Sequence, residues 1–146
     1  MAASSLGAAL VRATDRVSRS TVLDGPAQLL RRLGDAAVAN EAVAHVLHGA
    51  PIGHALHPLL TDLPLGMWMS STVLDLVGPP GTERGADRLL GLGILAAVPA
   101  AAAGAADWAS SERGDGDVRR IGTAHWLLNS TALALYGASW PRCRPP

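Results

Sequence analysis

The sequence has no phenylalanine, no lysine and a single cysteine, Cys143, among its 146 residues. One thiol cannot close an internal disulfide, which excludes the small secreted scaffolds that depend on several. Only 16% of the residues are charged, against about 25% in an ordinary soluble domain. Twelve arginines balance twelve carboxylates, so no basic excess indicates a nucleic-acid partner.

The motifs of several enzyme classes are also absent. The sequence contains no phosphate-binding loop, no nucleophile elbow and no HExxH zinc-protease motif. This argues against a soluble hydrolase or transferase, and the balance is against an enzyme. Alanine (27 residues) and leucine (22) instead make up a third of the chain. This composition predicts an all-α protein whose helices are wholly buried or face lipid.

Residues 1–50 are predicted to form a polar N-terminal segment with one amphipathic helix. Asp24 followed by Pro26 is typical of a helix start, and apolar residues then recur at steps of three, four and seven: Leu29, Leu33, Ala36, Val43 and Leu47. The helix should end near residues 49–51 and lie on a membrane surface or against the rest of the protein. His45 and His48 are expected on its solvated side, without a role. No signal peptide is recognisable, so we expect this segment to remain in the cytoplasm.

Residues 51–146 are predicted to form an integral membrane helical bundle. Three mostly apolar stretches occur here: Leu59–Val77, Leu89–Ala106 and Ile121–Trp140. A bilayer core needs about 20 helical residues, which predicts three spans at about 58–78, 88–107 and 121–140. We therefore expect a multi-pass protein of the bacterial cell (inner) membrane. The arginines that flank the spans do not decide its orientation.

A soluble alanine-leucine bundle is the alternative fold, and the modest mean hydropathy of +0.23 is compatible with it. The second stretch, Leu89–Ala106, has no polar side chain on any face. A small soluble three-helix bundle could not bury such a helix all round. The membrane fold is therefore favoured.

Polar residues inside the predicted spans are expensive in lipid and mark the first place to look for function. In the first span, His57 and Asp75 are five helical turns apart and share a face. In the third span, His125, Asn129 and Tyr136 also lie near one face. The second span has small residues at four-residue steps, which lets helices approach closely: Gly93, Ala97, Ala101 and Ala105.

Antiparallel connection of three spans would bring polar residues from different helices to one end: His54, His57, Asp62, Asp107 and His125. Asp75 would lie near the opposite end. Histidines from two helices with a carboxylate between them suit a transition metal, a haem iron or a proton relay. Candidate cofactor ligands are His54, His57 and His125, and candidate metal ligands are His57, Asp107 and His125. The same residues could instead serve only to pack helices, with Asp107 and His125 as a structural pair.

Three blocks of this sequence resemble an uncharacterised family of bacterial integral membrane proteins, a domain of unknown function. They are the run from Gly53 to Gly66 with Asp75 after it, the Gly104–Trp108 segment, and His125–Asn129 followed by Tyr136 and Trp140. The resemblance covers about residues 50–142. It implies a small four-helix membrane module, sometimes joined to a Rieske-type iron-sulfur domain, without an established activity.

The chain departs from that pattern because it stops at Pro146, where a fourth helix is expected. A bundle of three helices would be completed by a second copy or by a partner membrane subunit. Any iron-sulfur centre would belong to another protein, since the cysteines for a cluster are absent.

Three functions remain open from the sequence. One is a haem- or metal-binding membrane redox component, which an iron-sulfur protein could partner. Another is a structural or assembly subunit without a cofactor. A proton or ion path along His57, Thr61, Ser71 and Asp75 is the third, although three spans are few for a transporter.

Overall fold

The computed structural model describes residues 2–140, with side chains from residue 5 onward, and the described part of the chain is helical without strands. This confirms the predicted all-α fold. Two short 3-10 turns, Thr21–Leu23 and Ala50–Ile52, accompany six α-helices: α1 (Ala2–Ser18), α2 (Asp24–Val38), α3 (Glu41–Leu47), α4 (Leu56–Val77), α5 (Glu83–Ser111) and α6 (Gly116–Ser139).

The N-terminal segment contains three helices where the sequence predicted one. α2 begins at Asp24, as predicted, but the helix breaks before α3. Asn40 causes the break, because its backbone is extended and its side-chain oxygen accepts the N–H groups of Ala42 and Val43 as the cap of α3. α1 was not predicted at all.

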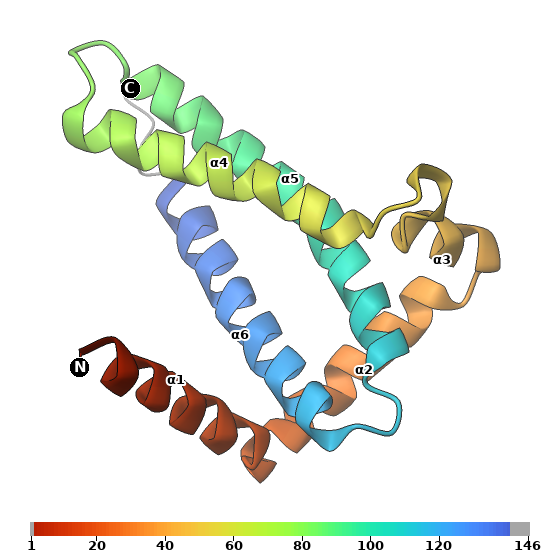
Figure 1. The fold of residues 1–146 in the computed structure, drawn as a ribbon. Helices are drawn as coiled ribbons and strands as arrows, with labels where there is room; N and C mark the ends of the chain where they lie inside the picture. The colour runs from red at the N-terminus through yellow and green to blue at the C-terminus, as the bar shows by residue number, and fades with distance from the viewer. Residues whose placement is uncertain (1, 141–146) are drawn as a thin grey trace.

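α3 is followed by a tight turn at Gly49. This residue has φ of +75°, and a Cβ there would collide with the carbonyl of His54. Only glycine adopts this left-handed, crowded conformation without strain. The turn reverses the chain, so that α3 lies beside the end of α5 before α4 begins (Figure 1).

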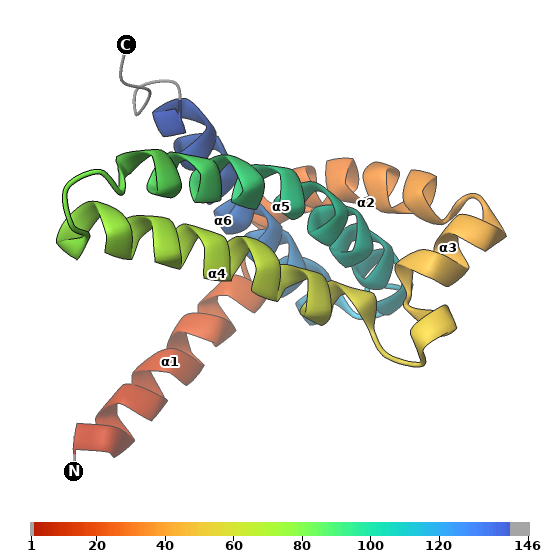
Figure 2. The same ribbon diagram turned by 90° about the horizontal axis from the view of Figure 1, so that it is seen from above.

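α4, α5 and α6 occupy the three apolar stretches that the sequence identified. Figures 1 and 2 show α4 and α5 side by side as an antiparallel hairpin, with α6 leaving the far end of α5 and crossing back toward the hairpin's turn. Of the described helices, α5 alone is long and apolar enough to cross a membrane by composition. α4 and α6 carry more polar side chains in their apolar stretches.

Small residues form the buried face of α5, and aromatic rings lie directly on its glycines. A Cβ added at Gly93 would lie 2.5 Å from the indole nitrogen of Trp68, and one at Gly104 would lie 2.7 Å from the His57 ring. The sequence predicted this close approach at Gly93 and Ala97, which are buried, but Ala101 faces outward. The close packing of the α4–α5 hairpin therefore depends on glycines, which leave room for rings of the neighbouring helix.

We predict that Gly93→Val destabilises the protein by about 1–3 kcal/mol, the usual cost of overpacking a tight core. The new side chain must displace Trp68, which lies on Gly93 from the neighbouring helix. Thermal unfolding in detergent measures the effect. Gly85→Ala in the same helix is the control, since its Cβ would meet only an ordinary 3.8 Å contact. Equal melting temperatures for the two variants would contradict this packing.

Candidate functional site

The polar residues of different helices meet at one end of the bundle, where α2 and α3 cover the end of α5 and the start of α6. Every ion pair of the described chain lies here. We call this set the polar network: Asp24, Arg31, Asp35, His48, Asp107, Glu112, Arg113, Arg119 and Arg120.

Glu112 is the most buried charge of the network. Its side chain is 1% exposed, and Arg31 of α2 donates to its Oε1 through Nε at 2.8 Å and through Nη2. The second carboxylate oxygen, Oε2, is buried without a partner among the described residues. A carboxylate at the C-terminal end of α5 also opposes the helix dipole. Arg31 is therefore the group that makes this burial tolerable.

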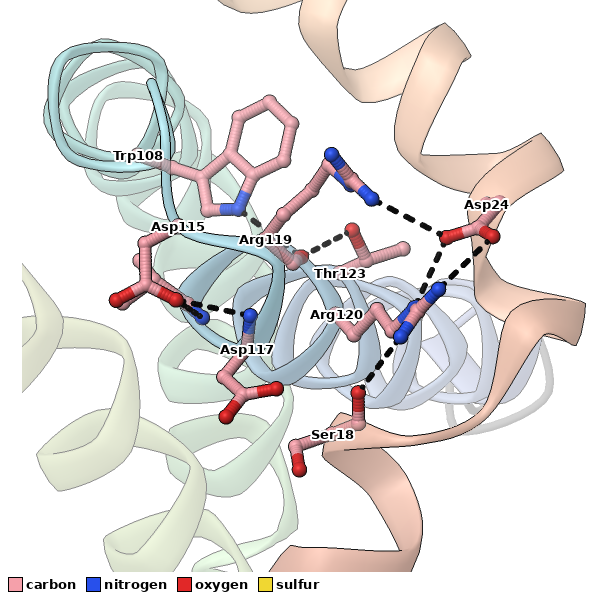
Figure 3. Close-up of polar contacts among 9 residues, drawn as sticks. Ser18, Asp24, Trp108, Asp115, Asp117, Arg119, Arg120 and Thr123 are labelled. Atoms are coloured by element: carbon pink, nitrogen blue, oxygen red, sulfur yellow. Dashed lines mark hydrogen bonds and ion pairs between the residues drawn. The ribbon is translucent and has the colours of Figure 1, made fainter.

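Asp24 joins the N-terminal segment to α6 (Figure 3). Arg120 donates to both carboxylate oxygens, through Nε at 3.0 Å and Nη2 at 3.1 Å, while its Nη1 donates to the carbonyl of Ser18 at 3.0 Å. Arg119 approaches Asp24 at 3.6 Å. The hydrogen bond from Arg120 holds the pKa of Asp24 below its ordinary value of 3.8. One arginine thus fixes both the end of α1 and the start of α2.

The start of α6 is shaped by local hydrogen bonds in the same region. Asp115 caps the helix by accepting from the backbone N–H groups of Asp117 and Val118 (Figure 3). Trp108 donates its indole N–H to the carbonyl of Arg119 at 3.4 Å, and its ring occupies the space that Gly122 leaves. These contacts fix the first turn of α6 and therefore the positions from which Arg119 and Arg120 reach Asp24.

Asp107 pairs with His48, a residue to which the sequence assigned no role. The His48 Nδ1 lies 2.9 Å from Asp107, and the Ser110 hydroxyl lies 3.3 Å from its Nε2. The expectation of a solvated His48 was wrong, because the turn at Gly49 brings α3 back over the end of α5. Asp107 therefore meets His48 rather than His125.

His57 holds α4 against α5. Its Nδ1 lies 2.8 Å from the carbonyl oxygen of Ala100, and because a carbonyl only accepts, Nδ1 carries the proton. The ring rests on Gly104. A backbone carbonyl that accepts from one ring nitrogen can orient an imidazole for metal binding through the other nitrogen, but the same hydrogen bond equally serves to pack the two helices.

The other predicted ligands do not join His57. His54 is exposed, with its Nδ1 at 3.0 Å from the neighbouring carbonyl of Ala55. His125 is exposed on α6, where its Nε2 lies 3.2 Å from the amide nitrogen of Asn129. Within residues 2–140, no three histidine, cysteine or acidic side chains lie where they could hold a metal ion. The metal and haem assignments thus remain predictions that the geometry of a single chain does not support.

A stacked pair of aromatic rings and one further hydrogen bond also join the helices. Trp68 of α4 stacks on Tyr136 of α6 with ring centroids 4.5 Å apart, a pairing that no spacing in the sequence indicated. Ser71 is buried and donates to the carbonyl of Ala86 at 2.9 Å. Asp75 lies near the other end of the hairpin and is exposed. Of the polar residues predicted along α4, His57 and Ser71 are thus used in contacts with α5, whereas Thr61 bonds within its own helix.

The family model of DUF2231, described as a predicted membrane protein, matches residues 53–143. The chain belongs to this family. The match covers α4, α5 and α6 and leaves out α1, α2 and α3. The polar network therefore joins residues of the family domain to a segment outside it. No curated protein and no solved structure matches the chain.

We predict that Arg31→Gln lowers the free energy of unfolding by about 1–3 kcal/mol, because it removes the half-exposed partner of the buried Glu112 carboxylate. Arg32→Gln is the matched control, since the adjacent Arg32 has no ion pair or hydrogen bond among the described residues. The double variant Arg31→Gln/Glu112→Gln should recover part of the loss by removing the buried charge. Chemical unfolding of the three variants measures this, and equal effects at positions 31 and 32 would refute the role of the pair.

The Asp24 interaction predicts a specific pH dependence. Because the folded-state pKa of Asp24 is lowered, its contribution to stability is complete above about 3.8 and is lost as the pH falls through the lower folded value. Asp24→Asn should thus lower the melting temperature by a few degrees at pH 6, and the difference from the wild type should shrink below pH 3.8. Asp15→Asn, on the exposed face of α1, should show no such convergence. A constant difference at all pH values would contradict this.

Proposed function

We propose that the chain is a multi-pass membrane protein in which α4, α5 and α6 cross the inner membrane and α1 to α3 form a polar cap on one side. Large apolar side chains point outward along all three helices: Leu59, Leu63, Leu65, Met69, Val73 and Leu76 on α4; Leu92, Leu95 and Val98 on α5; Ile121, Leu128 and Leu135 on α6. So many exposed large apolar side chains on three neighbouring helices are rare on a soluble monomer and ordinary in lipid.

The distribution of charge supports the same placement. The polar network lies at one end of α5, and the other end of that helix carries Glu83, Arg84, Asp87 and Arg88. Between the two charged ends, α5 has 18 residues without a polar side chain. This length corresponds to a bilayer core of about 30 Å.

The side chains of α1 are a further argument that a membrane surface lies on the side of the polar network. Arg12 and Arg16 of α1, with Arg19 just after it, line one shallow hollow together with Asp15, while Leu6 and Leu10 on the other side of the helix are exposed. Figures 1 and 2 show that only the C-terminal end of α1 lies beside the bundle and that the helix points away from it toward the N-terminus. Arginines beside an exposed apolar face are typical of helices that lie in a membrane interface.

Within the membrane, we propose a structural or assembly role rather than a cofactor-binding one. The observation that carries this is the use of the interior polar groups: His57 and Ser71 each bond to a backbone carbonyl of α5. Polar side chains that hydrogen-bond to a neighbouring helix determine which helices of a bundle pack together. The metal alternative requires His57, Asp107 and His125 to converge, and in a single chain they do not. Haem held between two helices would require His57 and His125 to face each other, whereas His57 bonds to α5 and His125 is exposed on α6.

Cysteine accessibility tests the three spans. In a Cys143→Ser background, Ile52→Cys and Ser111→Cys should react with an impermeant maleimide from one side of the membrane, and Pro80→Cys and Ser139→Cys from the other. These positions flank α4, α5 and α6 in turn. Reaction of all four from one side, with release of the protein by alkaline carbonate, would refute the proposed topology.

A second measurement on the same membranes separates the structural role from a cofactor site. Protein purified in mild detergent should show neither a Soret band nor stoichiometric metal, and His57→Ala should lower only the melting temperature. Bound haem or metal that disappears in His57→Ala or His125→Ala would instead establish the redox component.

A further inference from the structure

Asp62 is a carboxylate in the middle of the outward face of α4. It is exposed, and it has no hydrogen-bond or ion-pair partner among the described residues. Around it on the same face lie Leu65, Met69 and Val73, all largely exposed. The position one turn further, Gly66, has open space where a Cβ would be.

The register of the hairpin places Asp62 deep in the apolar layer. Trp68 lies on Gly93, and the His57 ring lies on Gly104 with its hydrogen bond to Ala100. Asp62 is therefore level with residues 95–99 of α5, close to the centre of its apolar run. A carboxylate there is costly when it faces lipid, and such groups normally face protein or a partner.

α6 carries a complementary pair on its own outward face. His125 and Asn129 are both exposed, one turn apart and in contact with each other. Contacts of Trp108 with Gly122 and of Trp140 with Gly91 place Asn129 level with residues 101–102 of α5, within about two turns of Asp62, and place His125 one turn further toward the polar network. Because the Asn129 amide donates to Nε2 of His125, the Nδ1 of that ring carries a proton and has no described partner.

We infer that Asp62 of one copy packs against the His125–Asn129 pair of a second copy, so that the chain forms a homo-oligomer through α4 and α6. Asp62 supplies an acceptor and His125 supplies the N–H donor. α4 and α6 run in the same general direction, so two copies with the same membrane orientation present Asp62 and Asn129 within about two turns of the same depth, with His125 one turn beyond Asn129. The inference rests on the proposed three-span topology.

Disulfide cross-linking of neighbouring positions tests this contact without removing it. In the Cys143→Ser background, one tagged copy carries Gly66→Cys and a differently tagged copy carries Leu133→Cys; each site lies one turn beyond Asp62 or Asn129. Mild oxidation of membranes should give several-fold more mixed dimer than the off-register control, Leu76→Cys with Leu133→Cys. Equal yields from the two pairs, or no mixed dimer, would overturn the inference.

Variants of the carboxylate complete the test. Asp62→Asn keeps an acceptor and should preserve the cross-link, whereas Asp62→Leu should abolish it. A cross-link that survives Asp62→Leu would also refute the contact. The maleimide pattern of the same variants shows whether they still fold into the membrane. A correct topology without the cross-link would refute the interface alone, whereas an incorrect topology would refute the proposed function.

Discussion

The close approach of α4 and α5 is the contact on which the rest of the structure depends. It requires glycine at positions 93 and 104, where the rings of Trp68 and His57 take up the missing side-chain volume. With the hairpin set at this distance, Ser71 and His57 reach backbone carbonyls of α5. In an apolar medium, where hydrophobic association between helices is weak, such packing and hydrogen bonds are the main source of specific contact.

The polar network plays the corresponding role outside the apolar layer. α2 packs on α5 through Leu30, which lies with Trp108 and Ala109, and through the buried Ala27 and Gly34. Arg31, His48 and Asp24 add polar attachments through Glu112, Asp107 and Arg120. Because Glu112 is buried and Asp24 is exposed to solvent to a larger degree, the first pair governs stability and the second responds to pH and salt.

The histidines illustrate how a plausible ligand set can serve another purpose. Three histidines and two aspartates at one end of a bundle have the chemistry of a metal or haem site. In the folded chain, His57 faces α5, His125 faces outward and Asp107 faces α3. The same outward direction that separates His125 from His57 makes it available, with Asn129, to a neighbouring molecule. A polar residue on a span therefore has to be assigned by the side of the helix that it occupies, not only by its depth.

The sequence by itself determined the all-α fold, the start of α2 at Asp24, the three apolar helices and the family. These depend on local composition and periodicity, because a helix forms from contacts within a few residues of the chain. Tertiary structure alone decided that His48 meets Asp107, that Arg31 meets Glu112 and that Trp68 stacks on Tyr136. Those pairs join residues far apart in sequence. Their meeting depends on the direction of short turns, above all the Asn40 cap and the left-handed Gly49, which no periodic pattern encodes.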